Sequence, residues 1–197
     1  MRAEARAAGT LTGTEPFNYY LSVLFPASQL TILPYNRVVS DRAGMDVGGL
    51  LERLVAAGFT VEEADAPVEP ERAGVIGMFT DGRWWRLSLG GALTAKVAGA
   101  DPVAALDVSV LQEHVLAPVL GIGDVRSDPR ISFVGGVRGV DELERRAGAE
   151  GVAFSMFATS IDQLLDVADA GLLMPPKSTW FEPKLRSGLF IHRIARP

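Results

Sequence analysis

The chain has no cysteine among its 197 residues. Disulfide bonds, thiolate nucleophiles and cysteine-based zinc or iron–sulfur sites are therefore excluded. Histidine is nearly absent as well, because His114 and His192 are the only two, and a histidine-based metal centre is not expected. No apolar run approaches the roughly 20 residues of a membrane-spanning helix, and the N-terminus lacks the apolar core of a signal peptide. These absences predict a cytoplasmic protein without membrane contact.

Lysine is scarce too, and positive charge is concentrated at the C-terminal end of an acidic chain. The net charge is −5. Residues 177–197 hold five Lys or Arg and one Asp or Glu. Residues 1–176 hold fourteen Lys or Arg and twenty-three Asp or Glu. Nucleic-acid binding is not expected of such a chain, since it depends on neutralising phosphates over a basic face. The basic end instead suits a small anionic partner.

The hydrophobic content of 48% is enough for the core of one domain. Alternating and β-branched patterns predict strands at residues 19–25, 30–39, 59–63, 75–80, 83–89, 131–134, 152–157 and 188–194. Asp81 and Gly82 suit a type I′ turn between two of these strands, and Pro34 interrupts another. The pattern predicts an α+β fold with a mixed, largely antiparallel sheet and flanking helices. The late strand, helix, strand, helix order would allow some parallel pairing.

Helices are predicted where apolar residues recur at helical spacing. Each begins at a residue or pair whose side chains suit the capping of backbone N–H groups. The predicted starts are Asp46, with Gly58 after the end of that helix, Asp141 with Glu144, and Ser160 with Gln163. Residues 102–120 are helical in period as far as Pro118, which ends or kinks the helix, and residues 90–100 are predicted to form a small-residue loop.

The C-terminal segment 174–197 combines prolines, aromatic residues and basic residues. Lys177, Ser178 and Thr179 follow two prolines that fix an extended backbone, so their side chains and amides would be able to converge on a phosphate or carboxylate. The spacing is not that of a P-loop. The alternative is a Pro-stiffened strap that packs Trp180 and Phe181 on the core with its lysines in solvent.

Two loops offer weaker candidate sites. Gly135 and Gly136 stand between a predicted strand and a helix start, where backbone amides favour anions; a plain turn is the alternative. Asp124 and Asp128 lie in one loop with two arginines, a pattern that fits Mg²⁺ held beside a phosphate. A solvated turn capped by its own aspartates is the alternative reading.

The two histidines and one pair of adjacent tryptophans are further candidates for functional or structural roles. His192 is predicted in a strand near Arg193, where it would act as a general base or phosphate ligand if its face opens to a cleft. His114 lies on an apolar helical stripe and is interpreted as a core histidine. Trp84 and Trp85 are adjacent in a predicted strand and must point to opposite faces. One is expected in the core, and the other is a candidate for an interface or ligand.

Several strings together resemble the bacterial and archaeal family catalogued as domain of unknown function 1015. They are GluProPheAsnTyrTyr at 15–20, LeuProTyrAsnArgValVal at 33–39, LeuAspValSerValLeuGln at 106–112, LeuGlyIleGlyAsp at 120–124, AspProArgIle at 128–131, PheValGlyGly at 133–136 and MetProProLysSerThrTrpPheGluProLysLeu at 174–185. Members of that family are longer and carry an Asp-Gly-His-His-Arg motif and an Ala-rich helix ahead of this region. The resemblance therefore implies that residues 1–10 are the remnant of a helix from a missing N-terminal region, although composition alone is equally consistent with a frayed terminus. Residues 11–197 would be a single α+β domain.

The missing motif is similar to one in ParB and sulfiredoxin-like proteins, which include nucleotide-dependent serine kinases. By that resemblance the complete protein would bind ATP or ADP with Mg²⁺. This chain would then be the C-terminal part of a nucleotide- or phosphate-binding, phosphotransferase-like protein, with Lys177, Lys184, Arg186 and His192 holding phosphate. Whether the chain is itself an enzyme stays open. The alternative function is a non-catalytic ligand-binding or dimerisation module, in which Trp180 and Phe181 contribute to the interface of a homodimer.

Overall fold

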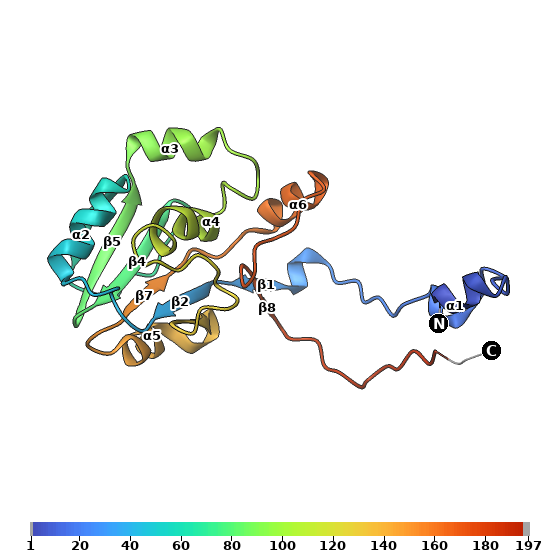
Figure 1. Ribbon diagram of the computed structural model, residues 1–197. Helices are drawn as coiled ribbons and strands as arrows, with labels where there is room; N and C mark the ends of the chain where they lie inside the picture. The colour runs from blue at the N-terminus through green and yellow to red at the C-terminus, as the bar shows by residue number, and fades with distance from the viewer. Residues whose placement is uncertain (1, 195–197) are drawn as a thin grey trace. The chain divides into compact units, whose positions relative to one another are not determined.

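The structure, a computed structural model, describes residues 2–194 and divides into two compact units (Figure 1). Unit 1 is formed by Met1–Thr31 and Pro183–Pro197, and unit 2 by Ile32–Glu182. Met1 and residues 195–197, which the predicted N-terminal helix and C-terminal strap include, lie outside the described residues. No helix within residues 2–194 is long and apolar enough to cross a membrane.

Unit 1 contains a short helix and two 3₁₀ turns, with little other regular structure. The helix is α1 (Arg2–Ala7), and the turns are η1 (Pro16–Asn18) and η2 (Ala27–Gln29). Whether α1 is the end of a longer helix stays a prediction. The strands predicted at 19–25 and 188–194 are wrong, because both segments run without a strand partner among the described residues. β-propensity alone forms no strand when no neighbour accepts its backbone hydrogen bonds.

Unit 2 is built on a six-stranded sheet in the order β3-β5-β4-β7-β2-β6. The strands are β2 (Tyr35–Val39), β3 (Phe59–Ala64), β4 (Val75–Thr80), β5 (Arg83–Leu89), β6 (Ile131–Gly135) and β7 (Val152–Ser155). Each neighbouring pair is antiparallel, which confirms the α+β class. The suggested parallel pairing is wrong for this sheet, because none of its neighbouring strands run in the same direction.

Two local predictions about the strands are confirmed. Asp81 and Gly82 have φ angles of 50° and 73°, as the type I′ turn between β4 and β5 requires. Pro34 divides the run at 30–39 into β1 (Thr31–Leu33) and β2, because proline donates no ladder hydrogen bond. β1 pairs in a separate two-stranded sheet with β8 (Trp180–Glu182).

Two helices begin as predicted. The Asp46 side chain accepts a hydrogen bond from Gly49 N at 2.8 Å and caps α2 (Val47–Ala56). Ser160 and Gln163 form the expected capping box of α6 (Ile161–Asp169).

Three other helices differ from expectation. Residues 91–98 form α3 (Gly91–Ala98) rather than a loop, because buried Leu93 anchors them. The capping box of α5 (Gly139–Ala147) is absent, since Glu144 instead accepts a hydrogen bond from Trp84 Nε1 at 2.7 Å. The helix expected over 102–120 is shorter, and α4 (Asp107–Leu111) continues as the π-helical turn η3 (Gln112–Leu116).

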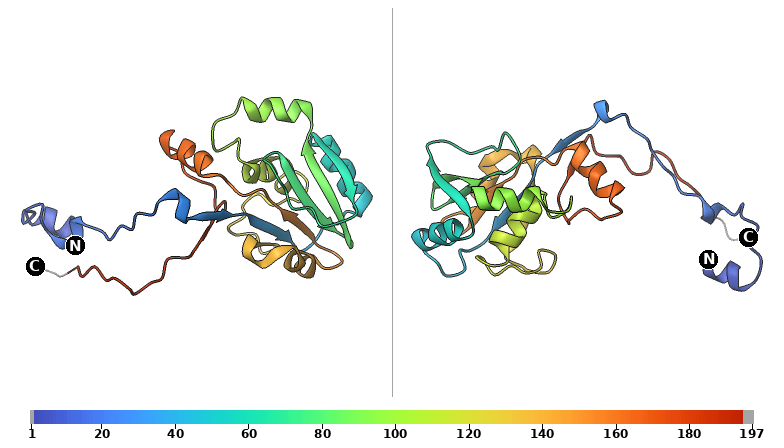
Figure 2. Two further views of the ribbon diagram at one scale, coloured as in Figure 1. Left: turned by 180° about the vertical axis from the view of Figure 1, so that it is seen from behind. Right: turned by 90° about the horizontal axis from the view of Figure 1, so that it is seen from above.

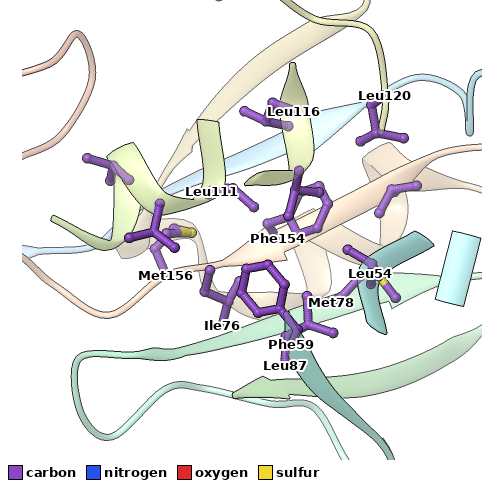
Figure 3. Packing of buried hydrophobic residues seen from close by; sticks show 14 of the residues in the cluster. Leu54, Phe59, Ile76, Met78, Leu87, Leu111, Leu116, Leu120, Phe154 and Met156 are labelled. Atoms are coloured by element: carbon purple, nitrogen blue, oxygen red, sulfur yellow. The ribbon is translucent and has the colours of Figure 1, made fainter. Parts of the chain in front are cut away.

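The sheet has a large core on one face and a smaller one on the other. The large core is packed by α2, α3, α4, η3 and α6, and Figure 3 shows its centre around Phe154, Met78 and Leu111. On the opposite face α5 contributes Leu143 and Ala147 (Figure 2). Trp84 packs in this smaller core, whereas Trp85 borders the large one, so the two do point to opposite faces.

Candidate functional site

β2 carries two buried polar side chains in succession, and they point to opposite faces of the sheet. Asn36 is 4% exposed and Arg37 is 3% exposed. Because side chains alternate along a strand, Asn36 shares a face with Val38 in the smaller core, and Arg37 shares a face with Val39 in the large one. Each of the two residues lines a cavity of its own.

Arg37 is a buried cation that has no carboxylate partner within residues 2–194. Its Nη1 donates to Tyr35 O, and its Nη2 donates to Lys177 O at 3.1 Å. Its Cζ lies 5.7 Å from the centroid of the Phe133 ring. Among the residues that the structure describes, no acid forms an ion pair with it. Burial lowers the pKa of Arg37 to about 10, so the guanidinium is still charged at neutral pH.

The cavity beside Arg37 has a volume of about 170 Å³. We call it the Arg37 cavity, and its other lining residues are Val108, Ser109, Gln112, Glu113, Leu116, Val125, Pro175 and Pro176. They come from α4, η3, the loop before β6 and the C-terminal segment. A charged donor thus faces a small, mostly apolar space, which is an arrangement typical of ligand sites.

Pro175 and Pro176, from the turn at residues 175–178, line one side of this cavity. Lys177 has a φ angle of +56°, and its carbonyl oxygen accepts from Arg37. Ser178 Oγ donates to Pro175 O at 2.9 Å, while Ser178 O accepts from Thr159 Oγ1 at 3.0 Å. These bonds hold the turn against the rest of unit 2, and both the strap and the ligand-binding interpretations of the C-terminal segment stay predictions.

The three predicted ligand residues of this segment differ in exposure. Lys177 is exposed, with its Nζ 5.6 Å from the centroid of the Tyr35 ring. The Ser178 hydroxyl is buried and engaged in the turn, and Thr179 is half-buried. The Ser178 hydroxyl is therefore engaged in the turn, whereas a ligand role for Lys177 or Thr179 stays a prediction.

The sequence did not point to Arg37 as a site residue. Its guanidinium donates a hydrogen bond to the carbonyl oxygen of Lys177, which lies in the predicted ligand-binding segment. A signal was present, because an arginine between the apolar residues of a predicted strand is a candidate for a buried charge. That signal identifies the residue but not its remote partner, since Lys177 lies 140 positions along the chain.

Close packing explains why residues 135 and 136 are glycines. A Cβ on Gly135 would lie 2.6 Å from Cζ3 of Trp180, and one on Gly136 would lie 2.7 Å from Cγ of Pro34. Gly136 also lines the second cavity, of about 200 Å³, together with Asn36, the start of α5 and Glu69. Because the Glu69 carboxylate opposes an anion there, the Gly135–Gly136 anion site stays a prediction with less support than the Arg37 cavity.

The chain belongs to the DUF1015 family. The family model described as "Protein of unknown function (DUF1015)" matches residues 1–109, more than half of the chain. The matched part includes Tyr35, Arg37 and the beginning of α4, whereas Gln112 and Pro175–Ser178 follow it.

Solved structures similar to this DUF1015 member have low identity to it. A free serine kinase mutant in complex with ADP has 18% identity and a TM-score of 0.46, covering 81% of this chain and 58% of that one. The free serine kinase in complex with AMP has 13% identity and a TM-score of 0.46, covering 78% and 54%. A conserved hypothetical protein from Pyrococcus furiosus has 17% identity and a TM-score of 0.45, covering 78% and 56%. The chain thus spans little more than half the length of these proteins, and the likeness is too low to carry a functional argument. No curated protein matches the chain.

The predicted ligand residues of this DUF1015 member divide between the two units. Lys177, Ser178, Thr179, Gly135 and Gly136 belong to unit 2. Lys184, Arg186 and His192 belong to unit 1, where all three are exposed and His192 Nε2 lies 2.8 Å from Pro16 O. The eight candidates therefore fall into two groups by unit, and a single site formed by all of them stays a prediction.

Asp124 and Asp128 are engaged within their own loop. Asp124 accepts from Arg126 N and Ser127 Oγ, both at 2.9 Å, and these bonds lower its pKa. The Arg130 guanidinium, 2.8 Å from Asp128, lowers the pKa of that carboxyl. Within residues 2–194, no three Asp, Glu or His side chains gather as a metal cluster. Both aspartates therefore cap their own turn, and the Mg²⁺ site stays a prediction.

His114 is half-buried at the margin of the large core rather than inside it. Partial burial, together with the charge of Lys96, lowers its pKa. The interpretation of a core histidine is wrong, because the residue is only partly buried.

Proposed function

We propose that this chain binds a small phosphate-bearing ligand in the Arg37 cavity, as part of a nucleotide- or phosphate-binding protein of phosphotransferase type. One observation carries the proposal, namely that the buried Arg37 guanidinium has no carboxylate partner among the described residues. Arginine has five N–H donors, and only two atoms of this one make hydrogen bonds in the described structure. A buried, uncompensated charge costs several kcal/mol, and a bound anion would offset that cost.

Lys177 adds a second positive charge next to the residues that border the cavity. Its exposed ammonium lies over the Tyr35 ring and follows Pro175 and Pro176, which line the cavity, although Lys177 itself is not a lining residue. A guanidinium that binds phosphate through two N–H groups and a lysine that acts as a point charge are a common combination at phosphate sites. The competing explanation is that Arg37 only clamps the 175–178 segment through the Lys177 carbonyl.

The size of the cavity bears on the predicted nucleotide. A volume of about 170 Å³ suits a phosphate group with a small substituent rather than a whole ATP or ADP. We propose that the phosphate end of the ligand enters the cavity. The described residues fit a phosphate but offer no carboxylate cluster for Mg²⁺, so Mg²⁺ would be held mainly through phosphate oxygens and water.

Calorimetric titration of the whole chain with inorganic phosphate, ADP and ATP tests the proposal. Replacing Arg37 by Lys keeps the charge but removes the planar fork, and we expect affinity to fall by roughly 10-fold or more. Arg83→Lys is the matched control, because Arg83 is an exposed arginine paired with Glu63 at 3.4 Å. If wild-type protein binds none of the three ligands, or if both variants bind as wild type does, the proposal is wrong.

A second candidate function is the dimerisation module, favoured by the apolar residues of unit 1. Large hydrophobic side chains are exposed throughout one extended segment; they are Tyr19, Tyr20, Leu21, Val23, Leu24 and Phe25. Contiguous exposed apolar surface of this kind marks an interaction site. The partner we propose is a second copy of this chain, and sedimentation velocity tests it.

A further inference from the structure

Asp107, the first residue of α4, has one carboxylate oxygen that is engaged and one that is open. Oδ1 accepts a hydrogen bond at 2.9 Å from the backbone N–H of Gly74, the residue before β4. Oδ2 accepts no hydrogen bond within residues 2–194. It nevertheless keeps accessible surface, because the one buried side-chain oxygen without a partner in that range is Gln112 Oε1. The contact with Gly74 therefore accounts for one oxygen of Asp107 and leaves the other available.

This carboxylate lines a cavity of about 250 Å³, which we call the Asp107 cavity. It lies between the start of β4, the end of β5, α3 and the start of α4. Much of its wall is aliphatic, from Leu89 in β5, Val97 and Ala98 in α3, and Ala105 ahead of α4. It shares no lining residue with the Arg37 cavity. A ligand here would occupy a site separate from the proposed phosphate site.

The charge of Asp107 is not balanced by a cation of the described chain. No ion pair joins this carboxylate to a basic side chain within residues 2–194. Burial raises the pKa of Asp107 to about 6, and the hydrogen bond from Gly74 opposes that rise. The group is therefore ionised near pH 7.5. A partly desolvated carboxylate without a counter-charge is costly, and a cation bound next to it would offset that cost.

A small cavity with aliphatic walls and one unpaired carboxylate suits a cation that has an apolar body. A primary ammonium supplies three N–H donors and a compact positive charge, while a short alkyl chain would contact Leu89 and Val97. We infer that the Asp107 cavity binds a small primary ammonium ligand with an apolar chain, and that the ammonium donates to Asp107 Oδ2. The inference goes beyond the proposed function and does not depend on it.

The remaining polar residues of the lining would act differently from Asp107. The hydroxyls of Ser88 and Thr94 accept from a neutral alcohol as well as from an ammonium, so they produce no preference for charge. Arg72 is exposed and is the other charged residue among the described lining residues. It would favour an anion and weaken the binding of an ammonium. The sign of charge that the cavity prefers therefore shows whether Asp107 or Arg72 governs it.

Three probes with the same number of carbon atoms separate these contributions. Near pH 7.5, n-butylammonium is positive, n-butanol is neutral and butyrate is negative. The test is titration of the whole ¹⁵N-labelled chain with each probe at equal ionic strength, followed by the amide signals in NMR spectra. We expect butylammonium to bind roughly 10-fold or more tightly than butanol and butyrate. It should shift the amide signal of Gly74, whose N–H donates to Asp107.

Three variants assign the preference to a residue. Asp107→Asn keeps an acceptor for Gly74 N but removes the charge, and its affinity for butylammonium should fall to that for butanol. Asp65→Asn removes the charge of an exposed aspartate outside the cavity and should bind all three probes as wild type does. Arg72→Gln removes the opposing charge and should keep or increase the preference for butylammonium.

The outcomes decide the inference without touching the phosphate titrations of the Arg37 cavity. It is wrong if no probe binds to folded wild-type protein, if the three bind equally, or if butyrate binds most tightly. It is also wrong if Asp107→Asn retains the preference for butylammonium, or if Arg72→Gln loses it. Should Asp107→Asn fail to fold, the three probes on wild type and on Arg72→Gln still decide between the two charged residues.

Discussion

Burial changes the ionisation of two side chains in unit 2 with different consequences. Arg37 keeps its charge at neutral pH, because its lowered pKa of about 10 is still far above 7. Asp107, at the start of α4, has its pKa raised from 3.8 to about 6 by burial, while a hydrogen bond from Gly74 N at 2.9 Å opposes that rise. The aspartate is thus the group that titrates in an accessible range.

The stability of the protein should depend on the ionisation of Asp107. The folded state holds this proton more tightly than the unfolded state, so the free energy of unfolding should fall as pH rises from about 4 to about 6 and stay lower above that range. Asn at position 107 keeps an acceptor for Gly74 N but does not ionise. We expect Asp107→Asn to match wild type near pH 4 and to exceed its stability by roughly 1–3 kcal/mol at pH 7.

Urea unfolding at both pH values measures this difference. Asp65→Asn, at an exposed aspartate in the loop after β3, is the control and should follow wild type at each pH. Parallel pH profiles for wild type and Asp107→Asn would show that the buried carboxyl does not destabilise the folded chain.

At the scale of elements, β8 packs against β6 through a glycine. Gly135 has φ −66° and ψ 140°, which any residue adopts, so its requirement is one of space. Its missing side chain makes room for the Trp180 ring, which also lies 5.3 Å from the Tyr35 ring in an edge-on contact. A substitution at Gly135 therefore tests how strongly the packing of Trp180 holds β8 against β6.

We expect Gly135→Ala to destabilise the chain by roughly 1–3 kcal/mol, because the added Cβ must displace the Trp180 ring. Gly123→Ala is the matched control, since a Cβ there meets no atom within 4 Å. Urea unfolding followed by tryptophan fluorescence compares the two variants. Equal stabilities would mean that Trp180 has room to move and that β8 is not held by this contact.

The strands that could be predicted from the sequence are those whose partners are close or whose turn residues are specific. The β4–β5 hairpin follows from Asp81 and Gly82, and α6 follows from Ser160 and Gln163. The strand at 19–25 has equally strong β-propensity, yet no described segment pairs with it. Propensity describes a residue's fit to a sheet, whereas pairing depends on segments far away in the chain.

At the scale of the whole molecule, the same limit applies to the candidate site. The sequence singled out residues 174–194 as one basic segment, but Lys177 belongs to unit 2 and Lys184 to unit 1. Arg37, on which the proposed site depends, lies 140 positions before Lys177 in the chain. Composition shows that positive charge is concentrated near the C-terminus. Only the tertiary structure shows that the buried Arg37 forms no ion pair with an acidic side chain of the described residues.

The apolar extended segment of unit 1 is a candidate for association, because its backbone N–H groups bond to no acceptor within the described residues. Between Tyr20 and Phe25 no backbone N–H donates to a described acceptor, and the segment contains no charged residue. Antiparallel pairing with the same segment of a second copy would satisfy these groups without bringing like charges together. We therefore expect wild-type protein to sediment as a dimer at micromolar concentration.

A lysine in this segment should prevent the association. Leu24 is 92% exposed, and Leu24→Lys would place two positive charges in the paired sheet, one from each copy. Leu173 is 87% exposed in unit 2, so Leu173→Lys adds the same charge outside the segment and should leave the dimer intact. Sedimentation velocity distinguishes the three proteins. A monomeric wild type, or a dimer that both lysine variants keep, would show that the 19–25 segment does not join two copies.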